Sequence, residues 1–202
     1  MATAQARFDD GVAALQRGDL DAARAAFEAA VELEPAHHEA WHQLGLVHHR
    51  CQRHIEAIAA VETAIEQGAE HPRVFGNLGT ICQRAGRVDE ALAHYATALE
   101  RDPDLVSAHS NRAALLTRRF AYGEAEAHLR RVLALEPGHA NAWNNLGVLC
   151  RDTLRLPEAV EAFRQALEVN PEDATAYSNL LLTLNYMPDL SPSEVFEAHR
   201  AY

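Results

Sequence analysis

The residues best suited to specific contacts are four asparagines that recur at a fixed interval of 34 residues. They are Asn77, Asn111, Asn145 and Asn179. An asparagine amide donates through its nitrogen and accepts through its oxygen, so it can pair with both polar groups of a peptide backbone. A row of such amides could hold an extended polypeptide with little regard to its side chains. The same column reads Asp9 and Gln43 in the first two units, where the row departs from this pattern.

A second row with the same spacing is basic. It consists of Arg50, Arg84 and Arg118. In a chain of net charge −11, this row would favour acidic segments of a partner. Both rows have a structural alternative: the asparagines could satisfy local backbone groups, and the arginines could simply be solvated.

The chain lacks the residues that several kinds of catalysis require. The chain contains no lysine, which removes a Walker-type phosphate loop and any Schiff-base mechanism. There is no G-x-S-x-G, H-E-x-x-H or glycine-rich phosphate motif. Cys51, Cys82 and Cys150 form no C-x-x-C pair, and the last two share one repeat position, which predicts buried thiols in a reducing compartment. We therefore predict that this chain is not an enzyme and needs no cofactor.

Histidine is abundant, with twelve residues, and raises the question of a metal site. His38 and His42 lie one helical turn apart, but no set of carboxylates or cysteines completes a closed four-ligand pattern around them. We predict no bound metal, and solvated helix histidines instead.

The excess of acidic residues and the lack of long apolar runs limit the classes of partner and the cellular locations that we expect. A sequence pI near 5.5 argues against a nucleic-acid or anionic membrane surface, because phosphate binding needs a concentrated basic face. No apolar run approaches the roughly 18 residues needed to cross a bilayer, and the start of the chain lacks the apolar core of a signal peptide. We expect a cytoplasmic protein that binds neither nucleic acid nor membrane.

The elements that position these residues follow from the same 34-residue period. Units begin at Ala4, His38, Pro72, Val106, Ala140 and Ala174. With the first residue of a unit as position one, position four is mostly aromatic and position eight mostly glycine or alanine. A large side chain can then fill the space between two helices while a small one lets them approach. The fourth unit carries His109 and Arg112 at usually apolar positions, which predicts looser packing there.

The second half of each unit has its own fixed columns. Position 20 is alanine without exception, at Ala23, Ala57, Ala91, Ala125 and Ala159. Position 32 is proline in four of five units and ends the second helix. The exception is Ala69, where Gly68 can end the helix instead.

These columns resemble the tetratricopeptide repeat (TPR) family over residues 4–185. The resemblance implies an all-α fold, a TPR α-solenoid in which antiparallel helix pairs form a right-handed superhelix. We expect five full 34-residue repeats, the first helix of a sixth, and a C-terminal capping or junction helix. The expected boundaries are 1–37 for the N-terminal capping repeat, then 38–71, 72–105, 106–139 and 140–173, and 174–202 for the partial sixth repeat and the junction. In TPR arrays the first helices line the concave groove, which implies that Asn77, Asn111, Asn145 and Asn179 face an extended or flexible protein segment there.

Residues 178–202 carry a second resemblance. The run from Asn179 to Asn185, the Pro188-Asp189 turn and the E-x-H-R element at 197–200 resemble the junction in bacterial relatives of the O-linked N-acetylglucosamine transferases and SPINDLY proteins. In that family the repeats present protein substrates to a nucleotide-sugar-dependent catalytic domain.

This second resemblance implies a substrate-recruiting region of a bacterial protein O-glycosyltransferase, whose catalytic domain would follow residue 202. The alternative is a free-standing TPR adaptor for assembly or secretion complexes. In either case, the apolar run Leu180–Leu184 could drive self-association if it is left exposed.

Overall fold

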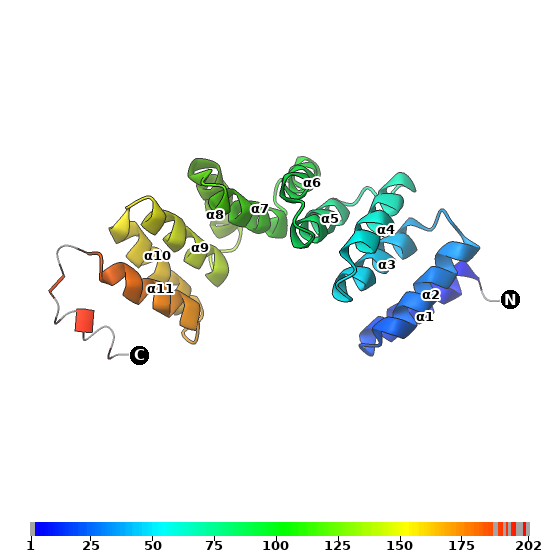
Figure 1. Cartoon of the computed structure of the whole chain (residues 1–202), viewed down its shortest axis with the longest axis horizontal. Coiled ribbons are helices and arrows are strands. Elements are labelled where there is room, and N and C mark those ends of the chain that lie inside the picture. The colour runs from blue at the N-terminus through cyan, green and yellow to red at the C-terminus, as the bar shows by residue number, and fades with distance from the viewer. Residues whose placement is uncertain (1–2, 188–189, 192, 194, 197–199, 201–202) are drawn as a thin grey trace. The chain divides into compact units, whose positions relative to one another are not determined.

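A computed structural model describes residues 3–187, 190, 191, 193, 195, 196 and 200 of the 202-residue chain. These residues contain eleven α-helices and no strand (Figure 1). In chain order the helices are α1 Ala4–Gln16, α2 Leu20–Leu33, α3 His38–Arg50, α4 His54–Glu66, α5 Pro72–Arg84, α6 Val88–Arg101, α7 Val106–Arg118, α8 Tyr122–Leu135, α9 Ala140–Asp152, α10 Leu156–Val169 and α11 Ala174–Leu184. The predicted all-α fold of helix pairs is confirmed, with five complete pairs and α11 as the first helix of a sixth.

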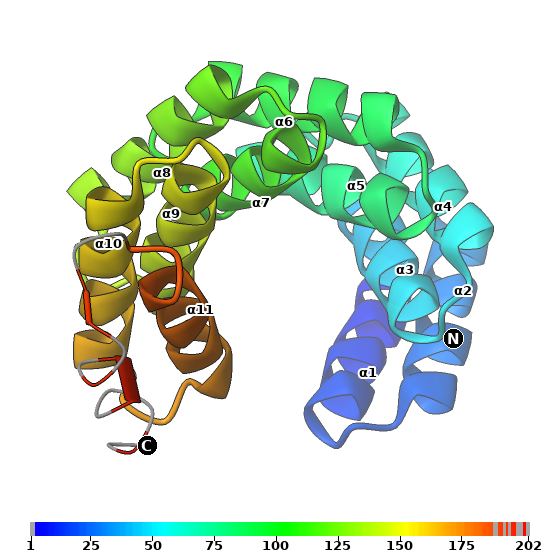
Figure 2. The ribbon, with the colours of Figure 1, turned by 60° about the vertical axis from the view of Figure 1, so that its left-hand side comes forward.

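Two compact units, residues 1–108 and 109–202, divide the chain within α7. In the first unit α1 pairs with α2, α3 with α4 and α5 with α6, while α2 packs on α3 and α4 on α5. In the second unit α8 packs on α9, α9 pairs with α10, and α10 packs on α11 (Figures 1 and 2). Within each unit the first helices of the pairs form one layer and the second helices form the other (Figure 2).

Most first helices begin at a side chain that accepts a hydrogen bond from the first turn. Thr3 and Asp173 do so at α1 and α11, as short polar side chains usually do. Histidine takes this role elsewhere: the Nδ1 atoms of His37 and His139 accept from the amides of Ala40 and Ala142 at 3.3 and 3.1 Å, and His71 Nδ1 accepts at α5. Three of the twelve histidines therefore act as helix N-caps.

The glycines at position eight each face a large side chain at position 24 of the same repeat. A Cβ atom at Gly11, Gly79 or Gly147 would lie 2.5 to 2.7 Å from the ring of Phe27, Tyr95 or Phe163. All three rings are fully buried. The predicted match of small and large residues therefore exists, but its large member is position 24 and not the aromatic at position four. The invariant alanines at position 20 are buried, as the column predicted: Ala23, Ala57, Ala91, Ala125 and Ala159.

The aromatic residue at position four contacts the linker that precedes it. The indole nitrogen of Trp41 donates to the carbonyl of Pro35 at 2.9 Å, and Trp143 donates to Pro137 in the same way at 2.8 Å. The third repeat lacks both partners of this bond, because it has Phe75 and is preceded by Ala69. There α4 ends early, at Glu66, and Gly68 adopts a left-handed φ of 101°.

Position 15, in the turn between the two helices of each pair, also has a left-handed backbone. Glycine occupies it twice, at Gly18 and Gly86, but Gln52, Phe120 and Leu154 adopt φ values of 60 to 62° in the other repeats. This conformation costs an L-residue roughly 1–2 kcal/mol. Phe120 and Leu154 are also 76% and 83% exposed, so packing does not offset the strain.

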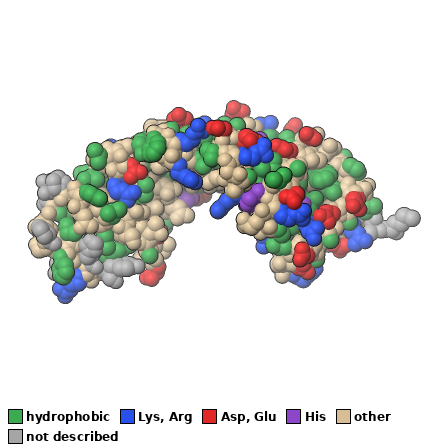
Figure 3. Space-filling view, in the orientation of Figure 1, with side chains coloured by type: hydrophobic (Ala, Val, Ile, Leu, Met, Phe, Trp, Pro, Cys, Tyr) green, Lys and Arg blue, Asp and Glu red, His purple; other side chains and the backbone are tan. Residues whose placement is uncertain are grey.

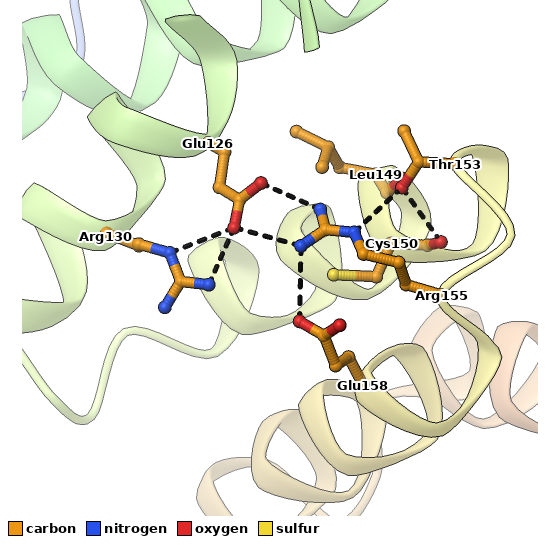
Figure 4. Close-up of polar contacts among 7 residues, drawn as sticks. All are labelled: Glu126, Arg130, Leu149, Cys150, Thr153, Arg155 and Glu158. Carbon is orange, nitrogen blue, oxygen red and sulfur yellow. Dashed lines mark hydrogen bonds and ion pairs between the residues drawn. The ribbon is translucent and has the colours of Figure 1, made fainter. Parts of the chain in front are cut away.

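The fourth repeat replaces apolar contacts with polar ones. His109 on α7 and His128 on α8 share a hydrogen bond between their Nδ1 atoms at 2.7 Å. Repeat four is joined to repeat five by Glu126, whose carboxylate accepts from the guanidinium of Arg155 at 2.7 Å (Figure 4). Thus polar bonds support the repeat for which the sequence predicted looser packing.

The C-terminal part of the described chain is apolar. On α11, Leu184 is buried, while Leu182 is 45% exposed. The predicted C-terminal capping or junction helix lies largely outside the described residues. Among the helices that are described, none has both the length and the apolar character needed to cross a membrane.

Candidate peptide-binding surface

The four asparagines of the predicted row are all half-buried and lie on successive first helices, α5, α7, α9 and α11. Asn77 belongs to the first compact unit, and Asn111, Asn145 and Asn179 belong to the second. The structure thus provides three row members within one unit and a fourth in the other.

In the second unit, Asn179 is engaged at both ends of its amide. Its Nδ2 donates to Asn144 Oδ1 at 3.1 Å, and its Oδ1 accepts from Arg151 Nη1 at 3.1 Å. Asn144 and Arg151 both lie on α9, so the amide bridges two consecutive first helices. The last member of the row therefore stabilises repeat stacking.

Asn145 differs from its neighbour in the row. Its amide is half-buried on α9 and makes no hydrogen bond to any described residue. The residue that would match Asn144 one repeat earlier is Ser110, whose short side chain forms no bond with Asn145. Because a half-buried amide without an internal partner keeps its donor and acceptor available, Asn145 is the member of the row best placed to contact a ligand.

In the first unit, Asn77 follows the same inter-repeat geometry as Asn179. Its Nδ2 donates to His42 Nε2 at 3.0 Å, again from position six of one repeat to position five of the preceding one. Burial is the main cause that lowers the pKa of His42, followed by repulsion from His71 and His38. A neutral His42 is the form that can accept this bond. The Asn77 oxygen still points to no described donor.

Neither pair supports the alternative that the asparagines satisfy local backbone groups. Asn77 and Asn179 both bond to side chains of the preceding repeat. The sequence prediction missed these bonds because it treated each column separately. Comparing position six with position five of the preceding repeat would have found polar partners at His42 and Asn144.

The predicted basic row lies at the ends of first helices. Arg50, Arg84 and Arg118 are the final residues of α3, α5 and α7, and all are exposed. None of the three forms an ion pair with a described residue. Cations at this position also stabilise the helix dipole, so these arginines have a structural role in addition to any contact with a ligand.

The remaining candidate chemistry has a structural explanation. Cys82 and Cys150 are buried as predicted, and burial raises the pKa of Cys82 to about 11, which keeps its thiol protonated and unreactive. No group of three or more His, Cys, Asp and Glu side chains in the described part of the chain could hold a metal ion. Acidic and basic side chains are interspersed on the face drawn in Figure 3, with no continuous basic area.

Family comparisons agree with this arrangement of helices. Family models described as tetratricopeptide repeat match residues 11–47, 37–104, 70–136 and 140–173. The chain therefore belongs to the tetratricopeptide repeat family. It is a protein–protein interaction scaffold of this family, whose repeat-only members are typically not catalytic.

Solved structures with a similar fold include those of three different proteins, YrrB, PilF and PilW. YrrB, described as "a TPR protein with an unusual peptide-binding site", is 23% identical with a TM-score of 0.76, over 92% of this chain and 93% of YrrB. PilF of Pseudomonas aeruginosa is 16% identical with a TM-score of 0.83, over 98% and 88%. PilW, a "widely conserved type IV pilus biogenesis factor", is 20% identical with a TM-score of 0.79, over 98% and 91%. No curated protein sequence matches the chain.

Proposed function

We propose that the first-helix layer binds extended segments of partner proteins by hydrogen bonding to their backbone, with Asn145 as the main contact. The observation that carries this proposal is the half-buried Asn145 amide, which has no internal partner among the described residues. Since leaving such an amide unpaired in a complex would be unfavourable, a bound backbone would gain both a donor and an acceptor there.

The other asparagines contribute in different ways. Asn111 occupies the equivalent position one repeat earlier and is also half-buried. Asn77 retains its oxygen as an acceptor, whereas Asn179 must give up a bond to Asn144 or Arg151 before it can contact a ligand fully. The peptide-binding site named for YrrB is consistent with this use of the fold.

The basic row sets a preference among partners. Exposed and without ion pairs, Arg50, Arg84 and Arg118 would attract acidic side chains near the C-terminal ends of the first helices. Because these contacts are solvated, we expect a modest effect that weakens with added salt.

A peptide selected from a random library on the full chain tests the proposal. We expect Asn145→Ala to weaken its binding by about tenfold, the loss of one or two ordinary hydrogen bonds, in a titration by fluorescence anisotropy. Asn170→Ala is the matched control, because Asn170 is exposed at the end of the second helix α10 and should not alter affinity.

Methylating single backbone nitrogens of the same peptide separates backbone from side-chain recognition. We expect at least one methylation to reduce the affinity of the unchanged chain but not that of the Asn145→Ala variant. Equal affinities of Asn145→Ala and the unchanged chain would contradict the proposal, provided that circular dichroism shows equal helix content.

Two narrower functions fit this proposal. The resemblance of residues 178–202 to the glycosyltransferase junction supports a substrate-recruiting region of a bacterial protein O-glycosyltransferase. The fold shared with a pilus biogenesis factor supports an adaptor in an assembly or secretion complex. Reading the gene beyond the codon for Tyr202 distinguishes them: a nucleotide-sugar-binding domain supports the first, and a stop codon contradicts it.

Self-association through α11 is a further part of this proposal. Leu182 is exposed on that helix, beside the half-buried Leu180 and Leu181. We expect sedimentation to show a concentration-dependent dimer that Leu182→Ser weakens, whereas an unchanged monomer at all concentrations would contradict it.

A further inference from the structure

A cavity of about 430 Å³ opens beside the first helices of the first unit. Its wall comes from α1, α3, the linker before α5, and the first turn of α5. The lining residues are Phe8, His38, Glu39, His42, Gln43, Ala69, Glu70, His71, Arg73 and Val74. Three imidazoles and two carboxylates thus converge on one opening.

The cavity lies where the repeat pattern is broken. Other linkers carry a proline at position 32, and two of these prolines accept the indole bond described above. Here Ala69 takes that position, is buried, and follows the left-handed Gly68. Glu70 and His71 of this linker line the cavity together with His38 and His42 of α3.

The charges around the cavity are not neutralised internally. Neither Glu39 nor Glu70 forms an ion pair with a described residue, and Arg73 does not either. With the histidines neutral, the wall therefore carries one more negative than positive charge. The acceptor nitrogens of His42 and His71 already bind Asn77 Nδ2 and the Arg73 amide, which leaves the imidazole of His38 as a further acceptor. The face of Phe8 can stack on a cation.

We propose that this cavity receives an arginine or lysine side chain of the bound polypeptide. The inference rests on the proposed function, because the first-helix layer would deliver that side chain to the opening. A guanidinium or ammonium group can donate to Glu39, Glu70 and the imidazole of His38, while its methylene stem lies against Val74 and Phe8. An acidic side chain would instead meet two unpaired carboxylates.

Binding of a basic side chain here is coupled to protons. Burial lowers the pKa of His42 from its ordinary value, so this imidazole is neutral near pH 7 and gains its positive charge only at acidic pH. Arg73 already faces the same opening. Protonation therefore opposes the bound cation, and affinity decreases toward acidic pH.

The test uses N-acetyl-arginine N-methylamide and its neutral isostere, N-acetyl-citrulline N-methylamide, with the full chain. Chemical shifts of the histidine rings report binding at pH 8.0 and pH 5.5. We expect the arginine probe to shift His42 and His71 saturably at pH 8.0, with about fivefold higher affinity than the citrulline probe, and this advantage to be smaller at pH 5.5.

Two matched substitutions test whether the preference for arginine arises at this cavity. Glu70→Gln should remove most of the preference for arginine, whereas Glu172→Gln, at the same position of repeat five in the other unit, should leave it unchanged. Equal affinity for the two probes, tighter binding at pH 5.5, or no effect of Glu70→Gln would each overturn the inference. Asn145→Ala lies outside the first unit and should not affect the probes, so this inference and the proposed function can fail separately.

Discussion

The two compact units are built from the same repeat but depart from it in different places. In residues 1–108 the departure is in a linker, where Ala69 replaces proline, and the helix pairs keep their buried ring and glycine contacts at Gly11 and Gly79. In residues 109–202 the main departure is inside repeat four. The turns at Phe120 and Leu154 also place an L-residue in the left-handed region, as the turn at Gln52 does in the first unit.

The comparison teaches where a repeat can vary and with what effect. A change in the linker leaves the contacts within a helix pair intact and alters the surface, so it yields a cavity. A change inside a helix pair replaces buried apolar contacts and alters stability and its dependence on pH.

The largest effect should come from adding one methyl group inside a helix pair. Gly79→Ala places a Cβ atom 2.7 Å from the buried ring of Tyr95, and we expect it to lower the free energy of unfolding by about 1–3 kcal/mol. Gly76→Ala in the same helix meets only Leu105 at 3.6 Å and should be neutral or stabilising. Urea titration of both variants measures the difference, and equal stabilities would contradict the packing described here.

The histidine pair of repeat four should make the second unit sensitive to acid. Burial, then His109 and Arg112, lower the pKa of His128 to about 4, below its usual value near 6.5. The folded state therefore disfavours the proton, and the stability present above pH 6.5 decreases as the pH falls toward 4. We expect a loss of roughly 1–2 kcal/mol, less than full linkage because the pair is partly open to solvent.

A double variant provides the control for this pH effect. His109→Trp with His128→Ala installs the residues that repeat five has at these positions, Trp143 and Ala162. Thermal unfolding between pH 7 and pH 4.5 should then show a smaller decrease in melting temperature than the unchanged chain. An identical decrease would show that the pair is not responsible.

The bond between repeats four and five should have an intermediate effect. Glu126 is 20% exposed and accepts from Arg155, and this hydrogen bond is the main cause that lowers the pKa of Glu126 (Figure 4). Glu126→Gln should lower the free energy of unfolding by about 1 kcal/mol near pH 7. The difference from the unchanged chain should become smaller at acidic pH, where the Glu126 carboxylate is protonated. Glu158→Gln removes a more exposed partner of the same arginine and should cost little. Denaturant titration at two pH values measures both.

The smallest effect should come from the strained turns of the second unit. Leu154→Gly relieves a left-handed residue that is almost fully exposed, and we expect it to raise the free energy of unfolding by about 0.5–1 kcal/mol. The reverse exchange in the first unit, Gly86→Leu, should lower it by a similar amount. Urea titration should therefore show changes of opposite sign in the free energy of unfolding for the two variants. Changes of the same sign would show that the left-handed conformation does not destabilise the turn at Leu154.

The sequence predicted those features that depend on a single column. The buried alanines follow from one residue type recurring at one spacing, and the all-α fold follows from the resemblance of such columns to the tetratricopeptide family. It did not predict the features that need two columns from different repeats, such as Asn77 with His42 or Asn179 with Asn144. These contacts depend on how one repeat stacks on the next, which packing decides and periodicity does not reveal.

The cavity and the histidine pair were missed for a related reason. The sequence predicts from Ala69 only a change in helix termination, yet Glu70 and His71 of the same linker also line the cavity. His109 was noted as a polar residue at an apolar position, but its partner His128 comes from a column without a pattern of its own. A residue that deviates from the repeat pattern is therefore informative mainly when the residues that it contacts are considered together with it.

The match between a glycine at position eight and a ring at position 24 joins residues of one repeat. A block such as residues 72–105 carries both members of this contact, Gly79 and Tyr95, so it can be duplicated without creating a mismatch between small and large residues. Repeat five carries its own pair, Gly147 and Phe163, in the same way. Both repeats are also joined to a neighbour by polar bonds, the third through Asn77 and His42 and the fifth through Arg155 and Glu126. In a lengthened array each inserted block would therefore keep its buried contact, and only the polar bonds between repeats would need new partners.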